Sequence, residues 1–134
     1  MRRLVIAAFI LLSACSSGEE LASAEKEIVR FHTDLSAGKG EQIHDRASAD
    51  WKQATAKPDA VQLFSGVRSK LGKFVSGKQE GWRVNYTTNG TIIIVQYNSK
   101  FEKAEGVETF TFKKNGDGAQ LVGYNINSKA LITG

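Results

Sequence analysis

The side chains best suited to proton transfer are two histidines and three aspartates in the first half of the chain. They are His32, His44, Asp34, Asp45 and Asp50. A histidine titrates near neutral pH, so either ring could act as a general acid or base. His32 and Asp34 are two positions apart and His44 and Asp45 are adjacent, so neither pair would share one face of a helix. The spacing predicts no acid–base pair, and the candidates for proton transfer are His32 and Asp50.

The residue pattern predicts neither a metal site nor a phosphate-binding loop. The two histidines are twelve residues apart, and the carboxylates around them match no ligand spacing for zinc or iron. Gly116-x-Gly118 is typical of a turn, because no helix with a suitably placed lysine follows it as in a phosphate loop. We therefore expect no bound metal and no cofactor.

The single cysteine, Cys15, stands at the end of a short apolar segment. Arg2 and Arg3 precede that segment, which is shorter than the about 20 apolar residues that span a bilayer. An ordinary secretory signal with a stray cysteine would leave an exposed thiol in an oxidising compartment, and an uncleaved anchor would need a longer apolar run. The motif Leu12-Ser13-Ala14-Cys15 resembles the lipobox of bacterial lipoproteins, which implies that residues 1–14 are a signal peptide that is removed.

The lipobox resemblance implies that Cys15 is acylated and anchors the protein to a bacterial membrane, facing the periplasm. By similarity to enterobacterial sorting signals, Ser16 favours the outer membrane over the inner membrane. Acylation would leave no thiol for a disulfide, a metal or a nucleophile. Removal of residues 1–14 would leave 16 basic against 14 acidic residues, and so weak an excess argues against nucleic acid as a partner.

The rest of the chain divides into a helical half and a strand half. Residues 15–21 are small and polar and are expected to form the lipidated cysteine and a tether. Apolar residues at helical spacing predict helices over about 22–37, 41–56 and 59–71. Gly72 stands where a helix C-terminal glycine is common.

After residue 72 the apolar positions recur at every second residue, as in half-buried strands. Asn89-Gly90 is a strong hairpin signal, and about four strands follow one another across short turns. Helices followed by antiparallel strands predict one α+β domain over 22–128, with a tail at 129–134. No predicted strand carries a histidine or an inward-facing aspartate opposite the histidines of the helices.

The order of these elements resembles the cystatin-like cone of the nuclear transport factor 2-like superfamily and, more narrowly, bacterial exported domains of unknown function with that fold. The segments that carry the resemblance are Trp51, Val67–Gly72, Val95–Phe101, Glu108-Thr109 and Leu121–Ile126. It implies about three N-terminal helices packed on a curved four-stranded antiparallel sheet. Enzymes of this superfold place an Asp/His or Asp/Tyr set inside the cone mouth, but the superfold also hosts binding and assembly domains.

Aromatic side chains crowd the strand half, where they either build the core or line a surface for a ligand or a partner. The candidates for such a surface are Arg83, Tyr97, Phe110, Phe112 and Tyr124. If the helices leave this surface uncovered, it predicts a homodimer or an envelope protein partner docked through the sheet.

Two functions remain open from the sequence. The first is a lipid-anchored envelope protein with a non-catalytic binding or assembly domain. The alternative is a small cone-fold enzyme that uses His32 or Asp50 for proton transfer. A pocket that encloses His32 with a carboxylate within hydrogen-bond reach would favour the enzyme, and a filled cone would favour the binding domain.

Overall fold

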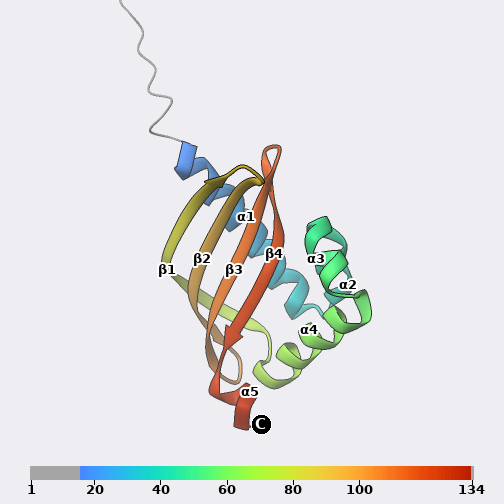
Figure 1. The fold of residues 1–134 in the computed structure, drawn as a ribbon. Coiled ribbons are helices and arrows are strands. Elements are labelled where there is room, and N and C mark those ends of the chain that lie inside the picture. The colour runs from blue at the N-terminus through green and yellow to red at the C-terminus, as the bar shows by residue number, and fades with distance from the viewer. Residues whose placement is uncertain (1–15, 134) are drawn as a thin grey trace, which may run out of the picture.

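The computed structural model describes residues 16–133, which form five helices and four strands (Figure 1). The proposed lipidation site Cys15 and the signal peptide lie outside the described residues. The elements are α1 (Ser16–Ser36), α2 (Gly40–Arg46), α3 (Ala49–Ala54), α4 (Lys57–Leu71), β1 (Phe74–Thr87), β2 (Gly90–Phe101), β3 (Glu105–Asn115), β4 (Gly118–Asn127) and α5 (Lys129–Thr133). No helix between residues 16 and 133 is long and apolar enough to cross a membrane.

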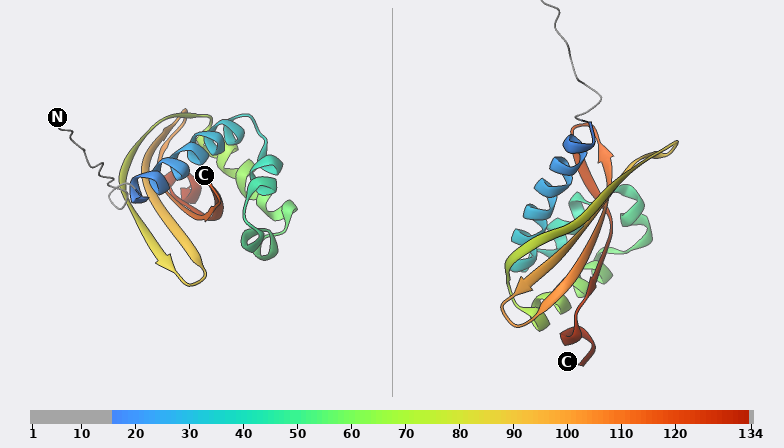
Figure 2. Two further views of the ribbon diagram at one scale, coloured as in Figure 1. Left: turned by 90° about the horizontal axis from the view of Figure 1, so that it is seen from above. Right: turned by 90° about the vertical axis from the view of Figure 1, so that its left-hand side faces the viewer.

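The four strands form one antiparallel meander in the order β1-β2-β3-β4. The sheet is twisted and curls around α1, while α2, α3 and α4 lie toward the β4 side (Figures 1 and 2). This arrangement confirms the predicted α+β class, with helices packed on one face of a four-stranded sheet. The period-two pattern of the sequence produces it, because one face of each strand can then be buried under the helices.

α1 is longer than predicted, because residues 16–21 are its first turns and not a tether. Leu21 packs against the core, and Glu20 is buried with its carboxylate 2.7 Å from the Lys114 ammonium of β3. The Ser23 hydroxyl donates to the backbone carbonyl of Asp117, in the turn between β3 and β4. Contacts with the sheet thus stabilise helical turns whose composition alone is typical of a loop.

The single helix predicted over 41–56 is interrupted between α2 and α3. The backbone N–H of Ser48 donates to the Leu121 carbonyl of β4, and the Ser48 hydroxyl accepts from the backbone N–H of Trp51. Ser48 is extended (φ −67°, ψ 160°) and caps the N-terminus of α3. The strand therefore holds this residue out of a helical conformation.

The interior of the curled sheet is filled by aromatic rings. Phe31 of α1 lies with its ring centroid 5.1 Å from Phe110 and 4.7 Å from Tyr124, and 5.6 Å from Phe64 of α4. These rings leave the cone packed at its centre, and α1 supplies the residues that close it against the sheet. The remaining space for a ligand therefore lies at the margins of the cone.

Candidate functional site

A carboxylate lies at the centre of the inner face of the sheet. Glu108 of β3 is completely buried, and it follows Gly106 and precedes Phe110 in the alternation that faces the helices. A buried carboxylate is costly unless several hydrogen bonds replace its water shell. Its surroundings therefore decide what the interior of this domain can do.

Three side chains from three other elements hydrogen bond Glu108. The Ser99 hydroxyl of β2 donates to Oε1 at 2.6 Å, and the Tyr124 hydroxyl of β4 donates to Oε2 at 2.6 Å. His32 of α1 places Nε2 2.7 Å from Oε1. Because a carboxylate only accepts, this contact is satisfied by an N–H on Nε2, which leaves Nδ1 as the acceptor nitrogen of a neutral ring. We call these four side chains the Glu108 cluster.

The two tyrosines near Glu108 are held in their protonated form. Burial raises the pKa of the Tyr124 hydroxyl well above its ordinary value, and the charge and hydrogen bond of Glu108 raise it further. Burial also raises the pKa of Tyr97, to about 12, together with the charge of Glu25, which accepts a 3.3 Å hydrogen bond from the Tyr97 hydroxyl. Both hydroxyls therefore remain donors at every physiological pH.

The His32 ring is fixed on its face as well as at its edge. It stacks on Phe74 of β1 with the ring centroids 3.6 Å apart and the planes within 4°. Phe110 contacts it edge-on, with the ring centroids 5.7 Å apart. Phe31, Tyr97 and Phe101 also lie edge-on to the ring, and His32 in addition lines an open groove.

The groove runs between α1 and the first part of β1 and has a volume of about 670 Å³. Its walls are mostly apolar and are formed by Ile28, Val29, His32, Thr33, Ser36, Ala37, Lys73, Phe74, Gly77 and Tyr97. Among the described residues, His32 Nδ1 has no hydrogen-bond partner and is not sealed from solvent. Gly77 keeps the wall thin, because a Cβ there would lie 3.0 Å from the Tyr97 ring and 3.1 Å from the Phe74 ring. The groove thus has a mostly apolar lining, and His32 is the buried polar side chain in that lining.

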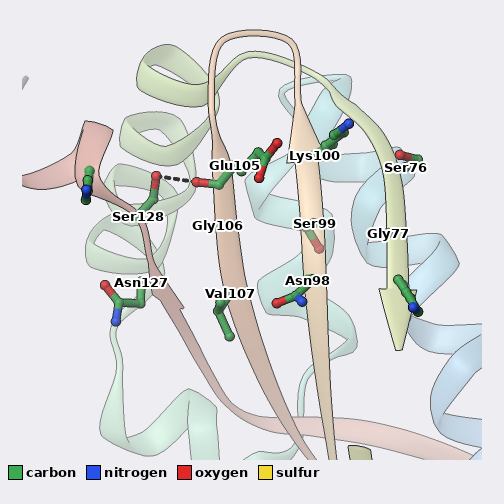
Figure 3. A pocket seen from close by; sticks show the side chains of 12 residues that line it. Ser76, Gly77, Asn98, Ser99, Lys100, Glu105, Gly106, Val107, Asn127 and Ser128 are labelled. Atoms are coloured by element: carbon green, nitrogen blue, oxygen red, sulfur yellow. Dashed lines mark hydrogen bonds between the residues drawn. The ribbon is translucent and has the colours of Figure 1, made fainter. Parts of the chain in front are cut away.

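A second depression, of about 630 Å³, lies on the opposite face of the sheet (Figure 3). Its floor follows one register row across all four strands, through Lys78, Asn98, Val107 and Asn127. The three polar side chains of this row are exposed to solvent and belong to the face that the helices do not cover. We assign the candidate site to the groove at His32, since there a buried polar network is directed at the ligand space.

Of the two residues predicted for proton transfer, the structure brings only His32 into this site. Asp50 lies on α3 with its side chain 64% exposed, and its nearest cation is Lys113 at 3.6 Å. The other two aspartates form ion pairs outside the groove. Asp34 pairs with Arg46 at 2.6 Å, and Asp45 pairs with Lys57 at 2.7 Å.

The remaining candidates occupy different places. His44 is buried, with Nε2 2.9 Å from the Thr55 carbonyl, outside the groove. Arg83 is exposed on β1 and faces away from the helices, opposite Ile94 of β2. Tyr97 lines the groove, and Tyr124 belongs to the Glu108 cluster.

The expectation of a free aromatic surface is wrong for Phe110 and Phe112. They are 0% and 1% exposed, because α1 and its neighbours cover the inner face of β3. A homodimer through these two rings would require unpacking the core. Among residues 16–133, no group of three or more His, Cys, Asp or Glu side chains could hold a metal ion.

Glu108 and Ser99 are the site residues that the sequence analysis missed. The signal for Glu108 was present, because a strand that buries Phe110 and Phe112 also points residue 108 inward. An inward-facing glutamate on a strand can meet a histidine of the helices just as an aspartate can. The same alternation on β2, which buries Val95 and Phe101, also points Ser99 inward.

The comparisons with known proteins show a family and a fold and give no established activity. The model of a family described as "Protein of unknown function (DUF3887)" matches residues 29–121. No curated protein matches the chain at a significant level. A solved structure from Novosphingobium aromaticivorans DSM 12444, named "Putative Scytalone Dehydratase", is similar with a TM-score of 0.51 and 11% sequence identity, over 82% of this chain and 84% of that chain. At this identity the similarity shows the fold alone, and it confirms the predicted α+β cone of helices packed on a four-stranded antiparallel sheet.

Proposed function

The chain belongs to the DUF3887 family of proteins of unknown function, and from its groove we propose that it is a membrane-anchored domain that binds a small, largely apolar molecule beside His32. The observation that carries this proposal is the His32 ring, which is held by Glu108 and Phe74 with its Nδ1 edge at the groove. Apolar walls would bind the body of the ligand by the hydrophobic effect, and one fixed polar group would orient it.

The chemistry of His32 narrows the class of ligand. With a neutral His32 ring whose proton lies on Nε2 beside Glu108, Nδ1 would offer a hydrogen-bond acceptor to the groove. A ligand with one hydroxyl or N–H donor on an apolar skeleton fits this wall. A hydrogen bond of this kind contributes about 1 kcal/mol to affinity, while an unpaired polar group buried at the same place would cost more.

A proton-transfer enzyme is the second candidate function, and the His32–Glu108 hydrogen bond is the observation that favours it. A carboxylate that fixes the tautomer of an imidazole is the arrangement that a general base requires. The filled centre of the cone and the one-sided groove favour binding over chemistry, because the groove does not enclose a reactant on every side. Asp50 takes no part in either function.

The anchor is the second part of the proposal. The motif Leu12-Ser13-Ala14-Cys15 supports acylation of Cys15 in the periplasm, with Ser16 favouring the outer membrane. Mass spectrometry of the membrane fraction should find an acylated N-terminal Cys15, and the Cys15→Ala protein should be exported in soluble form. An unlipidated wild-type protein would refute this part of the proposal.

The groove is tested with an apolar fluorescent amine, N-phenyl-1-naphthylamine, added to the soluble Cys15→Ala protein. We expect saturable binding that is lost in Gly77→Val, because the new side chain collides with Tyr97 and Phe74 across the groove. The matched control is Gly81→Val on the same strand, where a Cβ has open space and binding should persist. Equal binding by both variants would exclude the groove as the site.

The enzyme and the binding domain are separated by the fate of the bound molecule. Molecules co-purified with the wild type are identified by mass spectrometry and incubated again with fresh protein. A change of their mass with time that the His32→Gln protein does not cause would favour the enzyme. Recovery of the unchanged molecule from both proteins would favour binding alone.

A further inference from the structure

The outer half of the edge strand β1 carries two aromatic side chains that no helix covers. Trp82 is 41% exposed and Tyr86 is 61% exposed, with the half-buried Val84 between them. All three pair with inward-facing positions of β2, so they lie on the same face of the sheet as the core. They are left uncovered because the β1–β2 hairpin extends past the helices (Figure 2).

This hairpin extends at the same end of the molecule where α1 begins (Figures 1 and 2). Glu25 of α1 and Gln79 of β1 lie side by side, since the Gln79 side-chain amide donates a 3.3 Å hydrogen bond to the Glu25 carboxylate. We use this pair as a common reference point for the helix and the strand. From Glu25 back to Ser16 the helix rises about 14 Å, and from Gln79 to Tyr86 the strand extends about 23 Å. Beyond this reference point the hairpin is therefore longer than the part of α1 that precedes Glu25.

The start of α1 sets the distance between this end and the proposed anchor. α1 begins at Ser16, and adjacent Cα atoms are about 3.8 Å apart, so a lipid on Cys15 would leave no tether between bilayer and domain. The turn between β3 and β4 also lies at this end, where Asp117 accepts the hydrogen bond from Ser23 of α1. An acylated Cys15 would bring the whole end to the membrane surface.

We propose that Trp82 and Tyr86 enter the headgroup region of the bilayer and hold the domain on the membrane in one orientation. The inference rests on the anchor in the proposed function and goes beyond it, because it assigns a second contact. Tryptophan and tyrosine favour this region, where the ring is partly desolvated and the N–H or O–H stays hydrated. A lipid anchor and an interfacial contact together give a more stable attachment than either alone.

The charges at this end favour zwitterionic phospholipid over anionic lipid as the surface contacted. Glu19 is exposed in the first turn of α1, and Glu20 is paired with Lys114. Arg83 alternates with the two aromatic residues and faces the other side of the strand, where it can reach a phosphate. Cations and carboxylates thus balance, and the aromatic rings provide the attraction.

The chain provides its own probe, since Trp51 and Trp82 are its two tryptophans and Trp51 is buried in the core. A Trp51→Phe protein reports from Trp82, and the Trp82→Phe protein is the matched control. Each acylated protein is purified, its Cys15 lipid is verified by mass spectrometry, and it is reconstituted into phosphatidylethanolamine–phosphatidylcholine vesicles with or without brominated acyl chains. We expect a loss of Trp82 emission in the brominated vesicles and no loss in the control.

Equal Trp82 emission in both kinds of vesicle, with Cys15 acylated, would overturn the membrane contact and leave the anchor intact. Shielding of Trp82 from aqueous iodide without quenching by bromolipid would also overturn it, in favour of a second copy or another protein on this face. An unacylated Cys15 would overturn anchor and contact together. Hydrogen–deuterium exchange over 82–90 of the wild-type protein, with and without vesicles, decides the question if Trp51→Phe does not fold.

Discussion

Removal of one hydroxyl group tests whether Glu108 is stabilised as described. Tyr124→Phe keeps the ring that packs 4.7 Å from Phe31 and deletes the donor 2.6 Å from Glu108 Oε2. Among the described residues, Tyr124 is the donor to that oxygen, so the variant leaves half of a buried carboxylate without a partner. A hydrogen bond to a charged group contributes about 1.5–3 kcal/mol, so we expect a loss of about 2 kcal/mol in the free energy of unfolding.

Urea unfolding of the soluble Cys15→Ala background, followed by far-UV circular dichroism, measures this loss. The same loss should lower the melting temperature by about 8 °C for a domain of this size. Tyr86→Phe is the matched control, because that ring is 61% exposed and its hydroxyl should contribute less than about 0.5 kcal/mol. A Tyr124→Phe loss no larger than that of the control would refute the reasoning, since Glu108 would then not depend on this donor.

Three further predictions concern pH, a helix cap and a predicted site residue. Tyr97 and Tyr124 have a pKa raised on folding, so the folded chain keeps protons that the unfolded chain loses above about pH 10. The contribution of these two hydroxyls to stability should be constant below that pH and fall as pH rises toward about 12. Tyr97→Phe should reduce the fall in alkaline urea titrations. Ser48→Ala removes the cap of α3 and should cost about 1 kcal/mol in thermal unfolding, whereas an unchanged melting temperature would mean that the Leu121 contact alone holds the break. Asp50→Asn should change the free energy of unfolding by less than about 0.5 kcal/mol and should leave binding of the fluorescent amine unchanged. Weaker binding would show that Asp50 contributes to the site.

The elements of this fold were predictable where the signal is local. The alternation around Trp82 and the Asn89-Gly90 turn mark β1, β2 and their hairpin correctly, because strand periodicity and turn chemistry depend on neighbours in sequence. The start of α1 and the break at Ser48 were not predictable. Both depend on contacts with β3 and β4, from residues more than seventy positions away.

The site was predictable only in part for the same reason. His32 was identified from its residue type, but its role depends on Glu108, which is 76 residues away. The inward alternation places Glu108 in the core, but only the closure of the sheet around α1 brings the two side chains together. Sequence reasoning could thus find the members of the cluster one at a time, while their pairing is a property of the tertiary structure.

The uninterrupted course of α1 from Ser16 to Ser36 has a consequence for how a ligand reaches the groove. Sixteen residues separate Ser16 from His32, and they place the imidazole at most about 24 Å above the level of the proposed anchor. With α1 upright on the membrane, the groove would lie above the hydrocarbon core, so an apolar ligand would have to leave the bilayer and pass through water before it binds. The length of this helix would then decide which molecules are accessible, by selecting those that partition into the aqueous layer over the membrane.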